Sequence, residues 1–311
     1  MSDLETSGTL ETPSGKAAAD ENFPVGSWLI RADLRRHVHA LYRFARAADD
    51  IADNADLAAD DKVVRLARMA EIVTARPTFD SAGGASGSAA ELAASPSAVA
   101  MRGSLAESGV TAQHSVDLLA AFTQDATKRR YASWDELIAY CLLSAAPVGR
   151  HLLDLHGEGA ACRPAADALC NALQVINHLQ DCAADYRELD RVYLPQDMLA
   201  ACGASTEDLA APRLTPGLRR TLDRVIVPTQ ALLDQCADLV ALVDDPRMAL
   251  ECAVIRAMAM RITDLLRHGD PLATRVALSK PRMAMTAFGA MAAGLWRRRR
   301  HTGRASLASV P

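Results

Sequence analysis

Residues 174–185 of this 311-residue chain read QVINHLQDCAAD, and residues 42–53 read YRFARAADDIAD. Both stretches are rich in good helix formers and lack glycine and proline, so each predicts a helix. Each ends in two aspartates four residues apart, which share one helix face. Because like charges at this spacing repel by about 0.3 kcal/mol, the pattern indicates a bound cation. Mg²⁺ suits such a face, since it prefers carboxylate and phosphate oxygens.

The rest of the chain also predicts helices rather than strands. Hydrophobic residues make up 50% of the sequence but aromatic residues only 4%, which favours closely packed helices rich in Ala and Leu. Ser133 and Glu136 have the spacing of a capping box at the start of one helix, and Pro147 predicts a kink further along it. One all-α domain is therefore expected. Besides the helix that begins after Ser133, helices are predicted over residues 33–53, 60–75, 98–108, 115–128, 164–187, 216–243, 246–268 and 282–298.

Composition also marks the segments around and within this domain. Residues 1–20 are poor in apolar side chains and predict a disordered leader. The domain spans residues 21–282 and contains a Gly-, Ala- and Ser-rich stretch, 79–97, that predicts a flexible surface connection. Residues 283–311 form an amphipathic and basic tail containing the run Arg297–Arg300. That run is typical of a solvated tail and equally of a segment that anionic lipid attracts.

Net charge and cysteine content indicate the partners and the compartment. The net charge of −4 gives no reason to expect nucleic acid as a partner. The seven cysteines form no CxxC pair and the N-terminus lacks an apolar signal core, so a reducing cytoplasm is expected. No uncharged apolar stretch reaches the ~18 residues that span a bilayer. Residues 283–296 are amphipathic enough for surface contact, so a peripheral position at the inner membrane stays an open alternative.

The first aspartate pair belongs to a longer polar stripe. Tyr42, Arg46, Asp49 and Asp53 lie at offsets of 0, 4, 7 and 11, which places all four on one helix face. An aromatic ring, a guanidinium and two carboxylates make a poor core face. The stripe therefore indicates either a ligand site or a solvated face with pairs between Arg46 and the aspartates.

The second pair sits in a more apolar setting. Gln174, Asn177, Asp181 and Asp185 lie at offsets of 0, 3, 7 and 11, again on one face, among Leu, Val and Ile. Such oxygens need partners, which either a metal with diphosphate or a neighbouring basic helix would supply. Arg191 and Tyr193 follow the helix and could reach the same anion, since Arg suits phosphate. His178 is interpreted as a packing or supporting group rather than a metal ligand.

The chain resembles the squalene/phytoene synthase family over nearly all of residues 20–282. This resemblance implies the isoprenoid synthase helical bundle with a central apolar cavity, Mg²⁺-dependent chemistry on a prenyl diphosphate, and no requirement for NADPH. Neighbouring enzymes of squalene biosynthesis are implied as partners. The matching segments are ENFPV at 21–25, YRFAR at 42–46, DDIAD at 49–53, residues 140–150 and NHLQD at 177–181.

The resemblance also implies roles for individual residues. Asp49, Asp53, Asn177, Asp181 and Asp185 are expected to bind Mg²⁺. The residues expected to contact diphosphate or steer a carbocation are Tyr42, Arg46, Gln174, Arg191 and Tyr193. Those expected to line the hydrocarbon cavity are Tyr140, Ala145 and Gly149. Asn22 and Phe23 are expected to bind substrate.

Three departures from the family pattern bear on the reaction. This chain has Asp20-Glu21-Asn22 where many relatives have basic and hydroxyl residues. It has Gln180 in place of an arginine and Ala184 in place of an acidic residue. Together these changes weaken the case for two bound diphosphates. The resemblance is strongest to the hydroxysqualene-forming branch of hopanoid biosynthesis, which implies conversion of presqualene diphosphate and water to hydroxysqualene and diphosphate. Head-to-head condensation of two prenyl diphosphates to presqualene diphosphate, squalene or phytoene is the first alternative. A non-catalytic prenyl-lipid-binding protein is the second.

Overall fold

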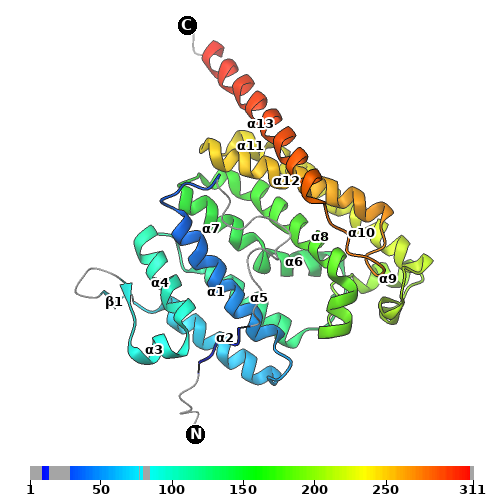
Figure 1. Ribbon diagram of the computed structural model, residues 1–311, viewed down its shortest axis with the longest axis horizontal. Coiled ribbons are helices and arrows are strands. Elements are labelled where there is room, and N and C mark those ends of the chain that lie inside the picture. The colour runs from blue at the N-terminus through cyan, green and yellow to red at the C-terminus, as the bar shows by residue number, and fades with distance from the viewer. Residues whose placement is uncertain (1–8, 14–28, 77, 80–84, 309–311) are drawn as a thin grey trace. The chain divides into compact units, whose positions relative to one another are not determined.

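The computed structural model describes residues 9–13, 29–76, 78–79 and 85–308, and these are largely helical (Figure 1). Strand structure among the described residues is limited to one antiparallel pair of two-residue strands. The all-α prediction is therefore confirmed. The described chain divides into two compact units, a first unit of residues 9–13 and 32–128 and a second unit of residues 29–31 and 129–308.

The first unit is built around α1 (Arg35–Asp53). This helix packs on α4, α5 and α2, and Leu41, Phe44 and Ile51 on its inner face are buried. These apolar positions recur at helical spacing on the face opposite the polar stripe. The other elements of the first unit are α2 (Ala59–Thr74), β1 (Thr78–Phe79), β2 (Ala85–Ser86), α3 (Ala89–Ala94), α4 (Pro96–Ser108) and α5 (Gln113–Thr127).

Residues 9–13 have a defined place in the first unit, although their composition predicts part of a disordered leader. Ser95 Oγ and the Ser97 N–H both donate to Glu11 Oε1 at 2.8 Å. A carboxylate there stabilises the N-terminus of α4. Thr12 Oγ1 donates to the carbonyl of Asp50 at 3.1 Å, so the segment also contacts α1. Residues 1–8 and 14–20 lie outside the described residues.

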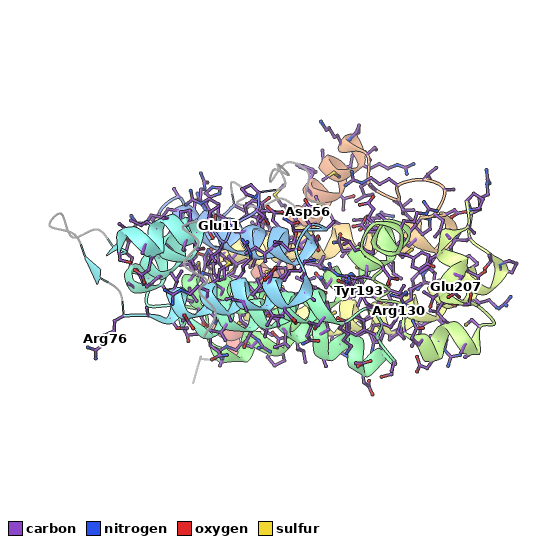
Figure 2. All side chains as sticks on the ribbon, turned by 90° about the horizontal axis from the view of Figure 1, so that it is seen from below. Glu11, Asp56, Arg76, Arg130, Tyr193 and Glu207 are labelled. Carbon is purple, nitrogen blue, oxygen red and sulfur yellow. The ribbon has the colours of Figure 1, made fainter. Side chains whose placement is uncertain are left out.

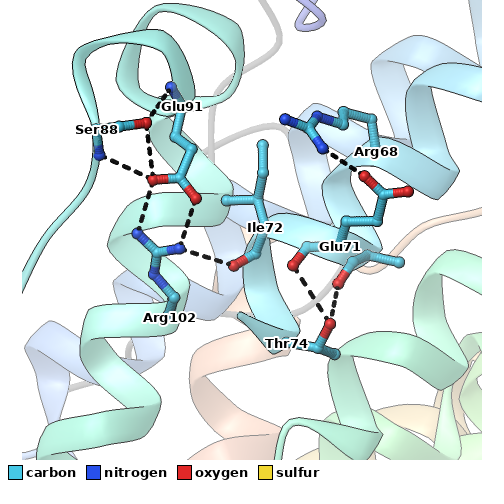
Figure 3. Close-up of polar contacts among 8 residues, drawn as sticks. Arg68, Glu71, Ile72, Thr74, Ser88, Glu91 and Arg102 are labelled. Carbon is cyan, nitrogen blue, oxygen red and sulfur yellow. Dashed lines mark hydrogen bonds and ion pairs between the residues drawn. The ribbon is translucent and has the colours of Figure 1, made fainter. Parts of the chain in front are cut away.

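The stretch expected as a flexible connection contains α3 and the start of α4. The buried guanidinium of Arg102 on α4 donates to the two carboxylate oxygens of Glu91 on α3, at 2.9 and 3.3 Å. It also donates to the carbonyl of Ile72 on α2 at 3.3 Å (Figure 3). The hydrogen bonds from Arg102 and then from Ser88 lower the pKa of Glu91 to about 2. Through Arg102, an ion pair and a hydrogen bond therefore join α2, α3 and α4.

Glu91→Gln is expected to lower the free energy of unfolding by about 2 kcal/mol, because the buried Arg102 charge loses its partner. Glu71→Gln is the matched control, since its pair with Arg68 is 63% and 54% exposed, and it should cost less than about 0.5 kcal/mol. The lowered pKa means that the Glu91 contribution is complete above pH 4.5 and is lost as the pH falls towards 2. Urea unfolding at pH 7 and pH 3 measures both effects, and equal losses for the two variants would contradict them.

The second unit is built around the long helix α8 (Arg163–Leu189), which packs on α6, α7, α10 and α12. The kink expected at Pro147 is instead a break, because α6 ends at Ser144 and α7 begins at Ala146. Pro147 then lies in the first turn of α7, where a proline needs no hydrogen-bond partner for its nitrogen. The other elements are α6 (Trp134–Ser144), α7 (Ala146–His156), α9 (Gln196–Ala201), α10 (Pro216–Gln235), α11 (Leu239–Leu242), α12 (Pro246–His268), α13 (Lys280–Ala308) and the 3₁₀ turns η2 (Ala160–Cys162), η3 (Thr206–Ala210) and η4 (Cys236–Asp238).

The capping box predicted for α6 forms only in part. Ser133 Oγ accepts from the Glu136 N–H at 3.3 Å, as expected. The Glu136 carboxylate, however, accepts from the N–H of Ala132. The Glu136 carboxylate thus binds the backbone of the residue before the N-cap. Ser133 remains the N-cap of α6.

Two long helices of the second unit are candidate membrane-contacting elements because of their length and composition. Among the described residues, one helical segment, Pro216–Leu242, is long and apolar enough to cross a bilayer by length and composition. Its main part, α10, packs on α8 and α12 and buries Leu218, Leu222 and Val225, as a core helix does. The C-terminal helix α13 packs on α12 and α11 and extends beyond both (Figure 1).

Candidate active site

The polar stripe of α1 lies on one partly exposed face, as its spacing predicts. Tyr42, Arg46, Asp49 and Asp53 are all half-buried, while the opposite face forms the core. Arg46 Nη1 lies 2.8 Å from Asp49 Oδ2 and 3.8 Å from an oxygen of Asp50. The pairing of Arg46 with the aspartates is therefore present, and it occupies one oxygen of Asp49.

Negative charge accumulates around Asp49. Burial, and then the charge of Asp53, raise the pKa of Asp49 to about 7 against the opposing effect of Arg46. Asp125 and Asp50 add smaller repulsions. At Asp49, repulsion from Asp53 thus outweighs attraction by Arg46, and a bound cation would relieve that repulsion.

Asp125 on α5 is a neighbour that the sequence analysis missed. It is buried and raises the pKa of Asp49 through its charge. The available signal was its position, because Leu118, Ala121 and Asp125 occupy one buried stripe of α5. An acidic residue in such a stripe indicates a polar neighbour on the helix opposite.

The second stripe has the same character on α8. Gln174, Asn177, Asp181 and Asp185 are half-buried, whereas Val175, Ile176 and Leu179 beside them are buried. The helix is continuous through the whole stripe, so the expected shared face is confirmed. Two carboxylates and two amides thus line one face of the central helix of the second unit.

A tight turn after α8 brings the chain back towards this stripe. Asp190 ends the helix with a φ of 52°, a left-handed conformation that aspartate tolerates better than most residues. Arg130 Nη2 donates to Asp190 Oδ1 at 2.6 Å, and the Val192 N–H donates to the carbonyl of Arg129 at 2.9 Å. These contacts hold Arg191 and Tyr193, both buried, in a fixed segment beside α8.

Four aromatic rings meet at this segment. The ring of Tyr193 stacks on His178 with centroids 3.6 Å apart and lies 5.4 Å from the ring of Tyr140. Tyr131 lies 5.2 Å from Tyr140 and 5.5 Å from Tyr193. Tyr193 lies among the packed side chains of the second unit, unlike the peripheral Glu207 (Figure 2). The structure thus brings Tyr140 and Tyr193 together and adds Tyr131, which the sequence analysis missed.

His178 is a neutral member of this cluster. Burial, and then the charge of Arg191, lower the pKa of His178 to about 3. Its Nε2 lies 3.3 Å from Gln174 Nε2; since the amide nitrogen is the donor, Nε2 is the acceptor of a neutral imidazole. The expected packing role is therefore supported, and the ring adds no positive charge beside the tyrosines.

His178→Phe is expected to remove part of the acid sensitivity of folding. Because the folded pKa is lowered from 6.5, the unfolded chain binds more protons below that pH, and stability falls as the pH decreases. This group alone should cost about 2 kcal/mol between pH 7 and pH 5. Urea unfolding of both proteins at the two pH values tests this expectation. An unchanged difference between pH 7 and pH 5 in His178→Phe would count against it.

The residues expected to line a hydrocarbon cavity lie on both sides of the break between α6 and α7. Tyr140 and Ala145 are buried, and Gly149 is half-buried. A Cβ at Gly149 would lie 2.6 Å from Cys170 Sγ, so glycine permits the close approach of α7 and α8. The cavity-lining role of these residues stays a prediction. Asn22 and Phe23 lie outside the described residues.

Gln180 has a clear structural use. It is buried, and its Nε2 donates to the carbonyl of Val276 at 2.6 Å. The side chain therefore holds the segment between α12 and α13 against α8. A neutral amide at this position adds no positive charge to the neighbouring stripe.

Each unit, taken by itself, offers few side chains that are arranged to bind a metal ion. Within the described ranges, no group of three or more His, Cys, Asp or Glu is arranged to hold a metal ion. Each stripe instead contributes two aspartates, Asp49 and Asp53 in the first unit and Asp181 and Asp185 in the second. Mg²⁺ is commonly bound by one or two carboxylates together with substrate phosphates.

Comparison with known proteins identifies the family of this chain. Residues 16–282 match squalene/phytoene synthase. The chain belongs to the squalene/phytoene synthase family. It is 45% identical to the hydroxysqualene synthase of Rhodopseudomonas palustris, over 93% of this chain and 94% of that protein.

Solved structures of family members agree with the fold. The chain is 30% identical to squalene synthase HpnC from Alicyclobacillus acidocaldarius, with a TM-score of 0.65 over 78% of this chain and 87% of that one. A dehydrosqualene synthase solved with a ligand gives a TM-score of 0.72 over 88% and 91% of the two chains, at 19% identity. The chain therefore has the all-α fold of squalene/phytoene synthases, as the family resemblance implied.

Proposed function

We propose that this family member converts presqualene diphosphate and water to hydroxysqualene and diphosphate, without a reductant, in the squalene branch of hopanoid biosynthesis. The carrying observation is the 45% identity to a hydroxysqualene synthase over 93% of the chain. The two carboxylate stripes add the chemical means to bind a metal diphosphate. Other enzymes of squalene biosynthesis are the proposed suppliers and users of these intermediates.

The carboxylate stripes fit Mg²⁺. The raised pKa of Asp49 reflects burial and repulsion from Asp53, and a divalent cation would favour the ionised form of both. In this proposal Asp49 and Asp53 on α1 bind Mg²⁺, and Asn177, Asp181 and Asp185 on α8 also bind Mg²⁺. When bound, Mg²⁺ supplies a Lewis acid for the leaving diphosphate.

Arginine and amide donors would hold the diphosphate while its bond to carbon breaks. The forked guanidinium groups of Arg46 and Arg191 suit phosphate oxygens, and the amide of Gln174 and the hydroxyl of Tyr42 add neutral donors. As the C–O bond breaks, the electron pair leaves with the diphosphate and a cyclopropylcarbinyl cation remains. Water then forms the new C–O bond, and its proton is released.

The aromatic cluster would stabilise the cation during its rearrangement. The faces of Tyr140 and Tyr193 carry negative charge density that attracts a cation, and their rings lie 5.4 Å apart. His178 stays neutral at physiological pH because its pKa is about 3, so it does not oppose the cation. Ala145 and Gly149, together with Asn22 and Phe23, are proposed to contact the hydrocarbon.

Substrate preference tests the proposal against head-to-head condensation. Purified protein is incubated with Mg²⁺ and either presqualene diphosphate or farnesyl diphosphate, with and without NADPH, and the products are identified by mass spectrometry. The proposal predicts hydroxysqualene from presqualene diphosphate alone, in equal yield with and without NADPH. Conversion of farnesyl diphosphate would instead establish a condensing enzyme, and failure to convert either substrate would leave prenyl-lipid binding as the better account.

A further inference from the structure

The C-terminal helix α13 exposes a row of large apolar side chains. Met285 and Phe288 are each 74% exposed, Leu295 is 49% exposed and Trp296 is 55% exposed. Met285, Phe288, Ala292 and Trp296 follow one another at intervals of three, four and four residues, which places them along one helix face. We name the four large side chains, Met285, Phe288, Leu295 and Trp296, the apolar row.

The opposite face of α13 is the one that packs on the second unit. Gly294 is buried, and a Cβ there would lie 3.1 Å from Leu250 and 3.5 Å from Ala253, both on α12. Two residues correspond to about 200° of rotation around a helix. Trp296 therefore points away from α12. The face of α13 that carries Gly294 is the one packed on α12, and the apolar row lies on the other face.

The charge of this part of the chain differs in sign from that of the whole protein. Eight Lys or Arg residues and no Asp or Glu follow Asp270, which gives residues 271–311 a formal charge of +8 in a chain of net charge −4. Four of the eight form the run Arg297–Arg300 directly after Trp296. The family match ends at residue 282, so the apolar row and this run lie outside the matched residues.

We propose that α13 docks this protein on the surface of a bilayer that contains anionic phospholipid, with the apolar row inserted at the level of the headgroups. An exposed apolar face followed by clustered arginines is the pattern of an interfacial helix. Phosphates of nucleic acid would use the arginines but leave Met285 and Phe288 in water. A second copy would bring two segments of charge +8 together, which repulsion opposes.

Vesicle flotation of the full chain tests this proposal. We expect binding to vesicles of phosphatidylcholine with phosphatidylglycerol, and much weaker binding to phosphatidylcholine alone. Replacing Arg297–Arg300 by glutamine should weaken binding to the anionic vesicles about a hundredfold or more. Phe288→Ser and Trp296→Ser should each weaken it about tenfold. Val227→Ser is the matched control, because Val227 on α10 is 67% exposed but lies outside the apolar row, and it should bind as the parent does.

The fluorescence of Trp296 gives an independent readout. Anionic vesicles should shift its emission to shorter wavelength, and the shift should be absent in Trp296→Phe. Equal binding to both kinds of vesicle, or full binding by Phe288→Ser and Trp296→Ser, would overturn the proposal. So would a blue shift that depends on protein concentration without vesicles, which indicates self-association, or tighter binding to duplex DNA than to anionic vesicles at the same salt concentration. Circular dichroism of each variant confirms that the helices remain folded.

Discussion

Asp49→Asn is expected to abolish turnover and at the same time to stabilise the metal-free protein. The proposed function assigns Asp49 to Mg²⁺, so the value of kcat/KM should fall about a thousandfold. In the metal-free protein, however, burial and then repulsion from Asp53 raise the pKa of the Asp49 carboxylate to about 7. An asparagine amide carries no charge, so Asp53 and Asp125 do not repel it. The metal-free variant should therefore have a higher free energy of unfolding.

The sign of the pH dependence follows from the direction of the pKa change. Because the folded pKa lies above 3.8, the folded chain binds the extra proton, and stability from Asp49 is lost as the pH rises through 7. The advantage of Asp49→Asn should therefore grow between pH 4 and pH 7 and then stay constant. The side chain is 33% exposed, so we expect a gain of about 1 kcal/mol at pH 8 rather than the full linkage value.

Thermal and urea unfolding without divalent cations measure this gain, and product formation with Mg²⁺ measures the loss of activity. Asp61→Asn is the control, because Asp61 is an exposed carboxylate on α2 of the same unit, and it should leave both quantities nearly unchanged. A less stable Asp49→Asn protein at pH 8, or one that keeps its activity, would show that Asp49 is an ordinary surface carboxylate.

Asp181→Asn is expected to cause a similar loss of activity, about a thousandfold in kcat/KM. The combined variant Asp49→Asn with Asp181→Asn should then lose at most about tenfold more than the worse single variant. The reason is that both aspartates are proposed to act on one metal-bound diphosphate, and groups that act as a unit are strongly non-additive. Independent functions would multiply to about a millionfold.

Single-turnover reactions with enzyme in excess keep the slow variants measurable. The combination of Asp181→Asn with Asp61→Asn serves as the additive control, since Asp61 belongs to no proposed site. Strict multiplication of the losses in the Asp49 and Asp181 pair would mean that the two stripes serve separate chemistry. That outcome would contradict the proposal that both aspartates act on one metal-bound diphosphate.

The regular parts of the fold could be read from the sequence because their signals are local. The segment predicted at 164–187 is α8 (Arg163–Leu189), and α12 (Pro246–His268) has the bounds predicted for it. Both combine helical periodicity with clear ends. The short elements α3 and α9 were missed, since six residues carry little periodic signal. The segment predicted at 216–243 is interrupted by the short 3₁₀ stretch η4 after Gln235.

The candidate site divides in the same way between local and non-local signals. The spacing of Asp181 and Asp185 was sufficient to place both on one face of α8. Nothing local shows that Tyr131, before α6, meets Tyr193, after α8, because that contact depends on the turn at Asp190. Likewise, the effect of Asp125 on Asp49 depends on the packing of α5 against α1.

The source of the oxygen atom in the product tests the proposed reaction most directly. Presqualene diphosphate is incubated with the protein and Mg²⁺ in water enriched in the heavy oxygen isotope, without NADPH, and the alcohol is analysed by mass spectrometry. Capture of the carbocation by water predicts hydroxysqualene that carries one heavy oxygen and diphosphate that carries none. An unlabelled alcohol, with the label in the phosphate product, would show that water attacks phosphorus and would contradict the account.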